Sequence, residues 1–145
     1  CCAVGASSSG SENGTVEKMR EFGEKVGMAF QIKDDLFDFG TDEIGKPLGI
    51  DIKEKKMTLP LIKALESASW SDRRRIRGIM RSDKKSKQKV QEVIDFVKKS
   101  GGIEYAQNVM QRFYDEAMEI LEEFEDSIYK KSLGQLVQFT IERNK

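Results

Sequence analysis

Residues 22 to 39 read as a helix that is apolar on nearly every side except for one polar line. On a helical wheel of about 100° per residue, Gly27, Gln31, Asp34 and Asp38 fall within about 60° of one another, with Asp35 at the edge. Apolar side chains fill the other directions: Phe22, Val26, Met28, Ala29, Phe30, Ile32, Leu36, Phe37 and Phe39. Such a helix belongs in the interior of a helical bundle.

The rest of the chain is also helical in pattern. Strand-like alternation is scarce, and the 145 residues include only two prolines. After a Ser/Gly loop at 6–13 and around a glycine-punctuated loop at 40–57, we expect helices at about 15–39, 58–67, 71–81, 86–99 and 103–124, with a last helix starting after Asp126 or Ser127. The sequence therefore predicts an all-α fold, an antiparallel helical bundle or part of one.

Apolar spacing also predicts which side chains enter the core. Helix 86–99 presents one apolar face, and the helix that follows continues the pattern. In the last helix the expected core residues are Ile128, Leu133, Leu136, Val137, Phe139 and Ile141. Trp70 is also expected to be a core residue.

Composition narrows the possible chemistry. The absence of histidine removes imidazole zinc sites and the Ser-His and Cys-His nucleophile pairs. Lys plus Arg and Asp plus Glu both number 25, so charge gives no reason to expect a nucleic-acid partner, and the basic segment 72–89 reads as solvated surface. No apolar run approaches the roughly 20 residues that span a bilayer. The adjacent Cys1 and Cys2 build no disulfide framework, which favours a reducing, cytoplasmic compartment.

The carboxylates in the polar line point to a hard cation. Asp34, Asp35 and Asp38 on a largely apolar helix would be partly desolvated and would repel one another, so they need neutralisation. Oxygen ligands without histidine or thiolate suit Mg²⁺, particularly Mg²⁺ bound together with substrate phosphates. Two plainer interpretations stay open: the line faces solvent, or lysines such as Lys25 and Lys33 neutralise it.

The loop after the acidic line adds a possible anion contact. Gly45 and Gly49 flank Lys46 and give the backbone freedom for its ammonium group to approach a bound anion. Carboxylates for a metal ion beside a lysine for phosphate are the minimum set for holding a diphosphate leaving group.

These segments together resemble the trans-polyprenyl diphosphate synthases. "GMAFQIKDDLFDF" is similar to the second aspartate-rich motif of that family, "GKPLGIDIKEKKMTLPLIKAL" to the stretch after it, and "YKKSLGQLVQFTIERNK" to the family's C-terminal helix. The resemblance implies an isoprenoid-synthase fold, usually homodimeric. It also implies a Mg²⁺-dependent prenyltransferase that joins an allylic diphosphate to isopentenyl diphosphate by ionisation, condensation and proton loss.

The resemblance also assigns roles to residues. Asp34 resembles the direct Mg²⁺ ligand, and Asp35 and Asp38 resemble supporting members that bind metal directly or through water. Lys46 resembles the lysine on the allylic diphosphate. Phe30 and Gln31 resemble residues that line the prenyl pocket near the reacting carbons.

The resemblance covers only the C-terminal half of such an enzyme. The first aspartate-rich motif and the isopentenyl diphosphate arginines have no counterpart here, so we expect residues 1–145 to be part of a single longer domain and to be inactive alone. "TLPLIKAL" favours a medium- or long-chain product over farnesyl or geranylgeranyl diphosphate. The alternatives are a non-catalytic regulatory subunit or helical interaction domain of the same fold, and, less favoured, a terpene cyclase.

Overall fold

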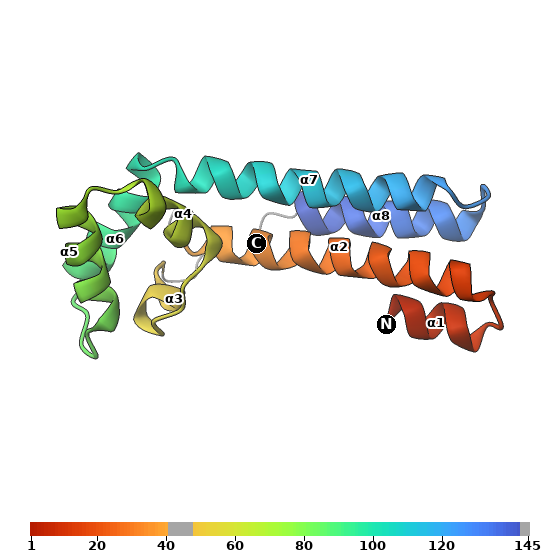
Figure 1. The fold of residues 1–145 in the computed structure, drawn as a ribbon, viewed down its shortest axis with the longest axis horizontal. Coiled ribbons are helices and arrows are strands. Elements are labelled where there is room, and N and C mark those ends of the chain that lie inside the picture. The colour runs from red at the N-terminus through yellow and green to blue at the C-terminus, as the bar shows by residue number, and fades with distance from the viewer. Residues whose placement is uncertain (41–47, 143–145) are drawn as a thin grey trace. The chain divides into compact units, whose positions relative to one another are not determined.

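The computed structural model describes residues 1–40 and 48–142 of the chain. Within these ranges the chain forms eight α-helices and no strand (Figure 1), which confirms the all-α prediction. The helices are α1 Cys2–Ser8, α2 Asn13–Phe37, α3 Ile50–Lys53, α4 Leu59–Ser67, α5 Trp70–Arg81, α6 Lys87–Lys99, α7 Gly102–Glu122 and α8 Ile128–Glu142. In the described part of the chain, none of them is both long enough and apolar enough to cross a membrane.

Side-chain caps explain where several helices begin. Ser86 precedes α6 and accepts a hydrogen bond from the backbone N–H of Lys89 at 3.3 Å. Ser69 caps α5 in the same way through the N–H of Asp72, at 3.1 Å. Helix α5 therefore begins at Trp70, one residue before the predicted Ser71, because Ser69 accepts the free N–H of Asp72 in the first turn.

The predicted loop at 40–57 contains a short helix in its described part. Helix α3 begins after Gly49, whose φ of +73° lies in the left-handed region that favours glycine. A helix of four residues has too few turns to leave an apolar period in the sequence, so pattern analysis missed it.

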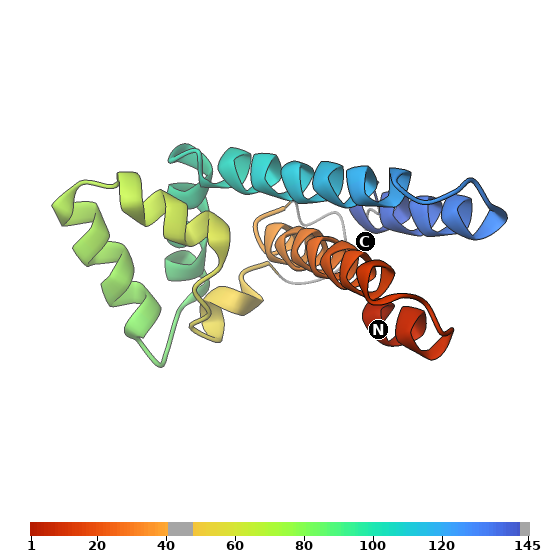
Figure 2. The same ribbon diagram turned by 45° about the vertical axis from the view of Figure 1, so that its right-hand side comes forward.

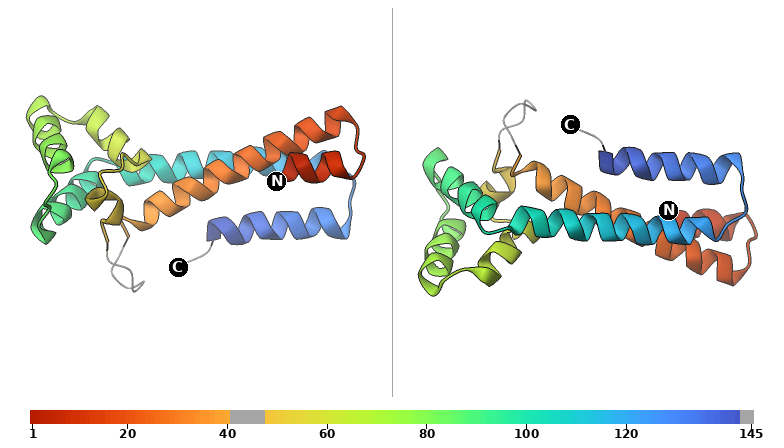
Figure 3. Two further views of the ribbon diagram at one scale, coloured as in Figure 1. Left: turned by 90° about the horizontal axis from the view of Figure 1, so that it is seen from below. Right: turned by 90° about the horizontal axis from the view of Figure 1, so that it is seen from above.

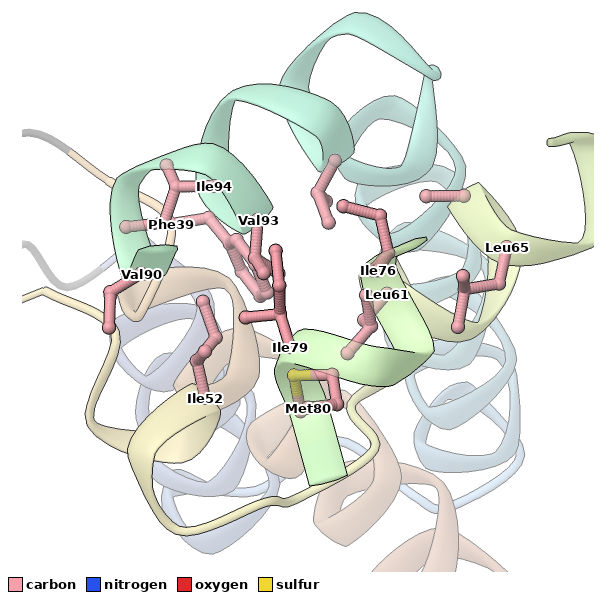
Figure 4. Close-up of a cluster of buried hydrophobic side chains, with 12 residues drawn as sticks. Phe39, Ile52, Leu61, Leu65, Ile76, Ile79, Met80, Val90, Val93 and Ile94 are labelled. Carbon is pink, nitrogen blue, oxygen red and sulfur yellow. The ribbon is translucent and has the colours of Figure 1, made fainter. Parts of the chain in front are cut away.

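The chain divides into two compact units: Cys1–Gln31 with Val109–Lys145 (unit 1), and Ile32–Asn108 (unit 2). In unit 2, helix α6 packs against α3, α4 and α5. The core of this unit is a cluster of buried side chains (Figure 4): Phe39, Ile52, Leu61, Ala64, Leu65, Ile76, Ile79, Met80, Val90, Val93, Ile94 and Val97. The predicted apolar face of α6 is confirmed by its four members of this cluster.

Unit 1 has a smaller core. The chain reverses after α7, so that α8 runs antiparallel to it (Figures 2 and 3). The fully buried members of the cluster between these helices and the first part of α2 are Phe22, Ala117, Leu121 and Val137.

Part of the predicted core of α8 is wrong. Val137 and Ile141 are buried, but Ile128, Leu136 and Phe139 are 73%, 60% and 66% exposed. The helix carries apolar residues on more than one face, and only one of those faces is covered in this structure. Trp70 was also expected in the core and is exposed; it is the first residue of α5, and the Arg74 guanidinium lies 5.4 Å from its ring centroid.

Candidate functional site

The end of α2 differs from the straight helix that the wheel assumed. Regular α-helix stops at Phe37, and the N–H groups of residues 38, 39 and 40 bond to the carbonyls of residues 35, 36 and 37, three positions back. This tightening into 3₁₀-type turns winds the chain faster than an α-helix. The helix was predicted to run to Phe39, but Asp38 lies after its observed end. The helical wheel, which assumes regular α-helix, therefore does not give the direction of Asp38.

Asp38 is buried and bonded to the backbone that follows the segment 41–47. Its Oδ1 accepts the N–H of Ile50 at 2.7 Å, and its Oδ2 accepts the N–H of Asp51 at 3.2 Å. Its carbonyl oxygen accepts the N–H of Gly49 at 3.2 Å. The side chain is only 8% exposed, and burial raises the pKa of its carboxyl, while the amide hydrogen bonds act in the opposite direction.

Asp35 makes a similar but longer contact with the next helix. The N–H of Leu59, the first residue of α4, lies 3.5 Å from its Oδ2. Thr58 occupies the N-cap position of α4, but its own side chain forms no capping bond. Its buried hydroxyl finds no hydrogen-bond partner among the described residues. The two later carboxylates of the motif thus lie at the N-termini of α3 and α4, where the helix dipole is positive.

The other predicted site residues lie as follows. Asp34 is half-buried near the end of α2, in unit 2, and takes part in interactions within the structure. Phe30 and Gln31, in unit 1, are exposed and likewise have partners. Lys46, predicted to contact a diphosphate, lies outside the described residues.

Lys25 and Lys33 are the two lysines that could neutralise the acidic line. Lys25 donates a hydrogen bond to Glu116 at 2.6 Å, both within unit 1. The ammonium of Lys33 lies 5.3 Å from the ring centroid of Phe37. The sequence did not predict that Asp38 and Asp35 contact the N-termini of α3 and α4. The available signal was Gly49, which precedes the short helix α3 and has no side chain to cap it.

The three motif carboxylates fit a divalent-cation site only in part. Among the described residues no three His, Cys, Asp or Glu side chains form a group that could hold a metal ion. Two of the three motif carboxylates contact backbone amides, as given above. Hard carboxylate oxygens still match Mg²⁺, which commonly takes one or two carboxylates, with waters and substrate phosphates completing its shell. Asp34 and Asp35 fit this pattern better than Asp38, because Asp35 accepts one amide at 3.5 Å whereas both carboxylate oxygens of Asp38 accept amides.

Comparison with known proteins gives a consistent result. The family model described as polyprenyl synthetase matches residues 1–97. A short chain isoprenyl diphosphate synthase from Methanothermobacter thermautotrophicus is 38% identical over 142 residues, which cover 97% of this chain and 43% of that protein. Solanesyl diphosphate synthase 1 from Arabidopsis thaliana is 35% identical and covers 91% of this chain, which corresponds to 32% of that protein.

A solved structure shares the fold. Geranylgeranyl pyrophosphate synthase from Corynebacterium glutamicum, complexed with calcium and isoprenyl diphosphate, superposes with a TM-score of 0.81 at 30% identity. The match covers 96% of this chain and 43% of that one. The chain therefore spans less than half the length of these relatives.

Proposed function

We propose, because this chain belongs to the polyprenyl synthetase family, that it supplies the second acidic motif of a trans-prenyltransferase. The reaction joins isopentenyl diphosphate to an allylic diphosphate. The allylic C–O bond breaks and diphosphate leaves with its electron pair. The isopentenyl double bond then forms a C–C bond to the cationic carbon, and loss of a proton gives an allylic diphosphate longer by one unit.

The observation that carries the proposal is the pair of half-buried carboxylates near the end of α2. Asp34 and Asp35 lie in unit 2, and the segment containing Lys46 follows directly in sequence. Half-buried carboxylates act on a bound cation through a lower effective dielectric than solvated ones do. A related synthase complexed with calcium and an isoprenyl diphosphate supports the assignment of a divalent cation to this family.

Each residue then has a defined part. Asp34 and Asp35 would hold Mg²⁺, which when bound neutralises charge on the departing diphosphate. Lys46 would donate to the same diphosphate. Phe30 and Gln31 would line the space for the prenyl chain. Asp38 was predicted as a third ligand, but both of its carboxylate oxygens accept backbone N–H groups, as described above.

The product and the assembly are further parts of the proposal. We favour a medium- or long-chain product on the "TLPLIKAL" stretch, although the relatives named above range from short-chain to solanesyl synthases. We also propose a homodimer in the cytoplasm, where Cys1 and Cys2 would stay reduced; both are free thiols in this structure.

Turnover tests the proposal. The chain joined to its upstream coding sequence is incubated with labelled isopentenyl diphosphate, an allylic primer and Mg²⁺, and the extracted products are separated by length. We expect chain elongation that stops with chelator and falls about a hundred- to a thousandfold in Asp34→Ala, the scale for losing one electrostatic contact that stabilises developing charge. Unchanged helix content in circular dichroism is the control for folding.

Two results would overturn parts of the proposal. Full activity in Asp34→Ala would remove Asp34 from the metal site. No elongation with any primer by the longer protein would favour the non-catalytic subunit. Residues 1–145 alone are expected to give no product.

A further inference from the structure

We infer that Asp38 is a positioning residue that clasps the end of α2 to the start of α3, and that it is not a direct metal ligand. The clasp is the set of three hydrogen bonds from residues 49–51 to Asp38. One side of it is the tightened turn at 38–40, and the other is the N-terminus of α3. The clasp itself does not depend on the proposed function. Only the statement that Asp38 is not a metal ligand rests on it.

The N–H groups of Ile50 and Asp51, which donate to the Asp38 carboxylate, have no acceptor within helix α3. The first N–H groups of any helix lack intrahelical acceptors, and Ile50 and Asp51 are the first two residues of α3. A capping side chain at the residue just before a helix normally supplies the acceptor, but here that residue is Gly49. Asp38, twelve positions before Ile50, supplies it instead.

Steric constraints explain why glycine occupies the cap position. A Cβ atom on Gly49 would lie 2.2 Å from Cγ1 of Val90, which is buried in the core of unit 2. Together with the left-handed φ, this excludes Ser, Thr, Asn and Asp, the residues that usually cap a helix. A cap on α3 therefore has to come from elsewhere in the chain.

The clasp is anchored in the core on both sides. Phe39 follows Asp38 and Ile52 follows Asp51, and each is 1% exposed in the cluster that also holds Val90 (Figure 4). Lys98 adds a bond from its ammonium to the carbonyl of Gly40 at 3.3 Å. Residues 49–51, which follow segment 41–47, are thus linked to Asp38, which precedes it.

Both carboxylate oxygens of Asp38 are already engaged as acceptors. A direct metal bond would draw the same carboxylate toward a cation and away from two amides that would then be orphaned, which is costly in a buried position. Asp34, four residues earlier on the same helix end, forms the natural comparison. Asp34→Asn, Asp38→Asn and Asp38→Ala are therefore the informative variants.

Amide hydrogen exchange in the metal-free, ¹⁵N-labelled chain tests the clasp. We expect protected amides at Ile50 and Asp51 in the wild type, and exchange there at least about tenfold faster in Asp38→Ala, because both amides then lose their acceptor. Asp38→Asn keeps one oxygen acceptor and should give intermediate protection. Asp34→Asn should leave both amides unchanged, and Ile94 in α6 reports global unfolding.

Titration with Mg²⁺ and inorganic diphosphate, followed by amide shifts, separates positioning from ligation. We expect Asp38→Asn to keep the half-saturating Mg²⁺ concentration within about twofold of wild type, and Asp34→Asn to raise it at least about tenfold, the loss expected of a charge-assisted contact.

The inference is overturned if Ile50 and Asp51 exchange as fast in wild type as in Asp38→Ala, or if Asp38→Asn weakens Mg²⁺ binding as much as Asp34→Asn does. Absence of Mg²⁺ and diphosphate binding in the wild type counts against the proposed function, and exchange then decides the clasp. Should Asp38→Ala not fold, the Asn variant carries the exchange comparison.

Discussion

The two units handle charge in different ways. Unit 2 buries the carboxylate of Asp38 on backbone amides beside its large core. Both units have ion pairs at the surface, such as Lys25 with Glu116 in unit 1 and Arg75 with Glu92 in unit 2, but unit 1 has the smaller core. Exposed pairs contribute little and are screened by salt, whereas a buried cap is screened much less. Unit 2 is therefore the unit expected to hold its shape around a site.

The largest expected contrast lies between two leucines. Leu61 is fully buried in the core of unit 2, and Leu136 on α8 of unit 1 is 60% exposed. We expect Leu61→Ala to lower the free energy of unfolding by about 2–5 kcal/mol, because it leaves a cavity, and Leu136→Ala to change it by less than about 0.5 kcal/mol. Urea unfolding followed by circular dichroism measures both. Similar losses would show that α8 is covered in solution.

Substitution of one glycine in each unit tests how closely the two units are packed. A Cβ on Gly102, at the start of α7, would lie 2.3 Å from the backbone oxygen of Pro60, whereas one on Gly134 in α8 would meet Met118 at 3.5 Å, an ordinary contact. Gly102→Ala should cost about 1–3 kcal/mol through overpacking. Gly134→Ala should stabilise by about 0.5–1 kcal/mol through helix propensity. Thermal unfolding gives the signs, and a stable Gly102→Ala would contradict the close packing of α4 and α7.

The pH dependence should have opposite signs in the two units. Burial raises the pKa of Asp38 above its ordinary 3.8. This shift adds to the free energy of unfolding; the addition is complete below pH 3.8 and is lost as pH rises through the folded pKa. The hydrogen bond from Lys25 lowers the pKa of Glu116 below 4.5, so that contribution is present above 4.5 and lost as pH falls through the folded pKa.

Difference curves make these signs measurable. From below pH 3.8 to neutral, the stability of wild type minus Asp38→Asn should fall with pH, and that of wild type minus Glu116→Gln should rise. Urea midpoints at each pH give both curves. Slopes of the same sign would mean that one of the two environments is misassigned.

The smallest expected effect is the salt response of unit 1. Lys25 and Glu116 are partly exposed, with side-chain exposures of 25% and 35%. Glu116→Gln should destabilise slightly at low salt and have almost no effect near 1 M salt, where the Debye length is about 3 Å. The effect of Asp38→Asn should persist at both salt concentrations. A salt-independent Glu116→Gln effect would show that this pair is shielded from solvent.

Sequence patterns predicted the helices because their signals are local. The approximate start of α6 and its apolar face follow from spacing and side-chain chemistry, and the structure confirms both. What covers a helix is not local: Ile128 and Phe139 have the same apolar character as Val137, but only Val137 is buried here. A pattern cannot tell which of two apolar faces has a partner.

The candidate site shows the same limit. The motif and its neighbouring residues predicted carboxylates at the end of one helix, which is where Asp34 and Asp35 lie. The tightened turn at 38–40 moved Asp38 out of the regular helix. Its amide partners come from a four-residue helix that follows a glycine with positive φ, and neither feature leaves a periodic signal. The metal-ligand roles stay predictions.

Residue-resolved hydrogen exchange at increasing denaturant tests the contrast between the units most directly. We expect the amides of Val93 and Ile94, buried in unit 2, to exchange only through global unfolding, and those of Val137 and Ile141 on α8 to exchange through a smaller opening of lower free energy. Equal protection of α6 and α8 at every denaturant concentration would contradict the conclusion that unit 2 is the more stable scaffold for the site.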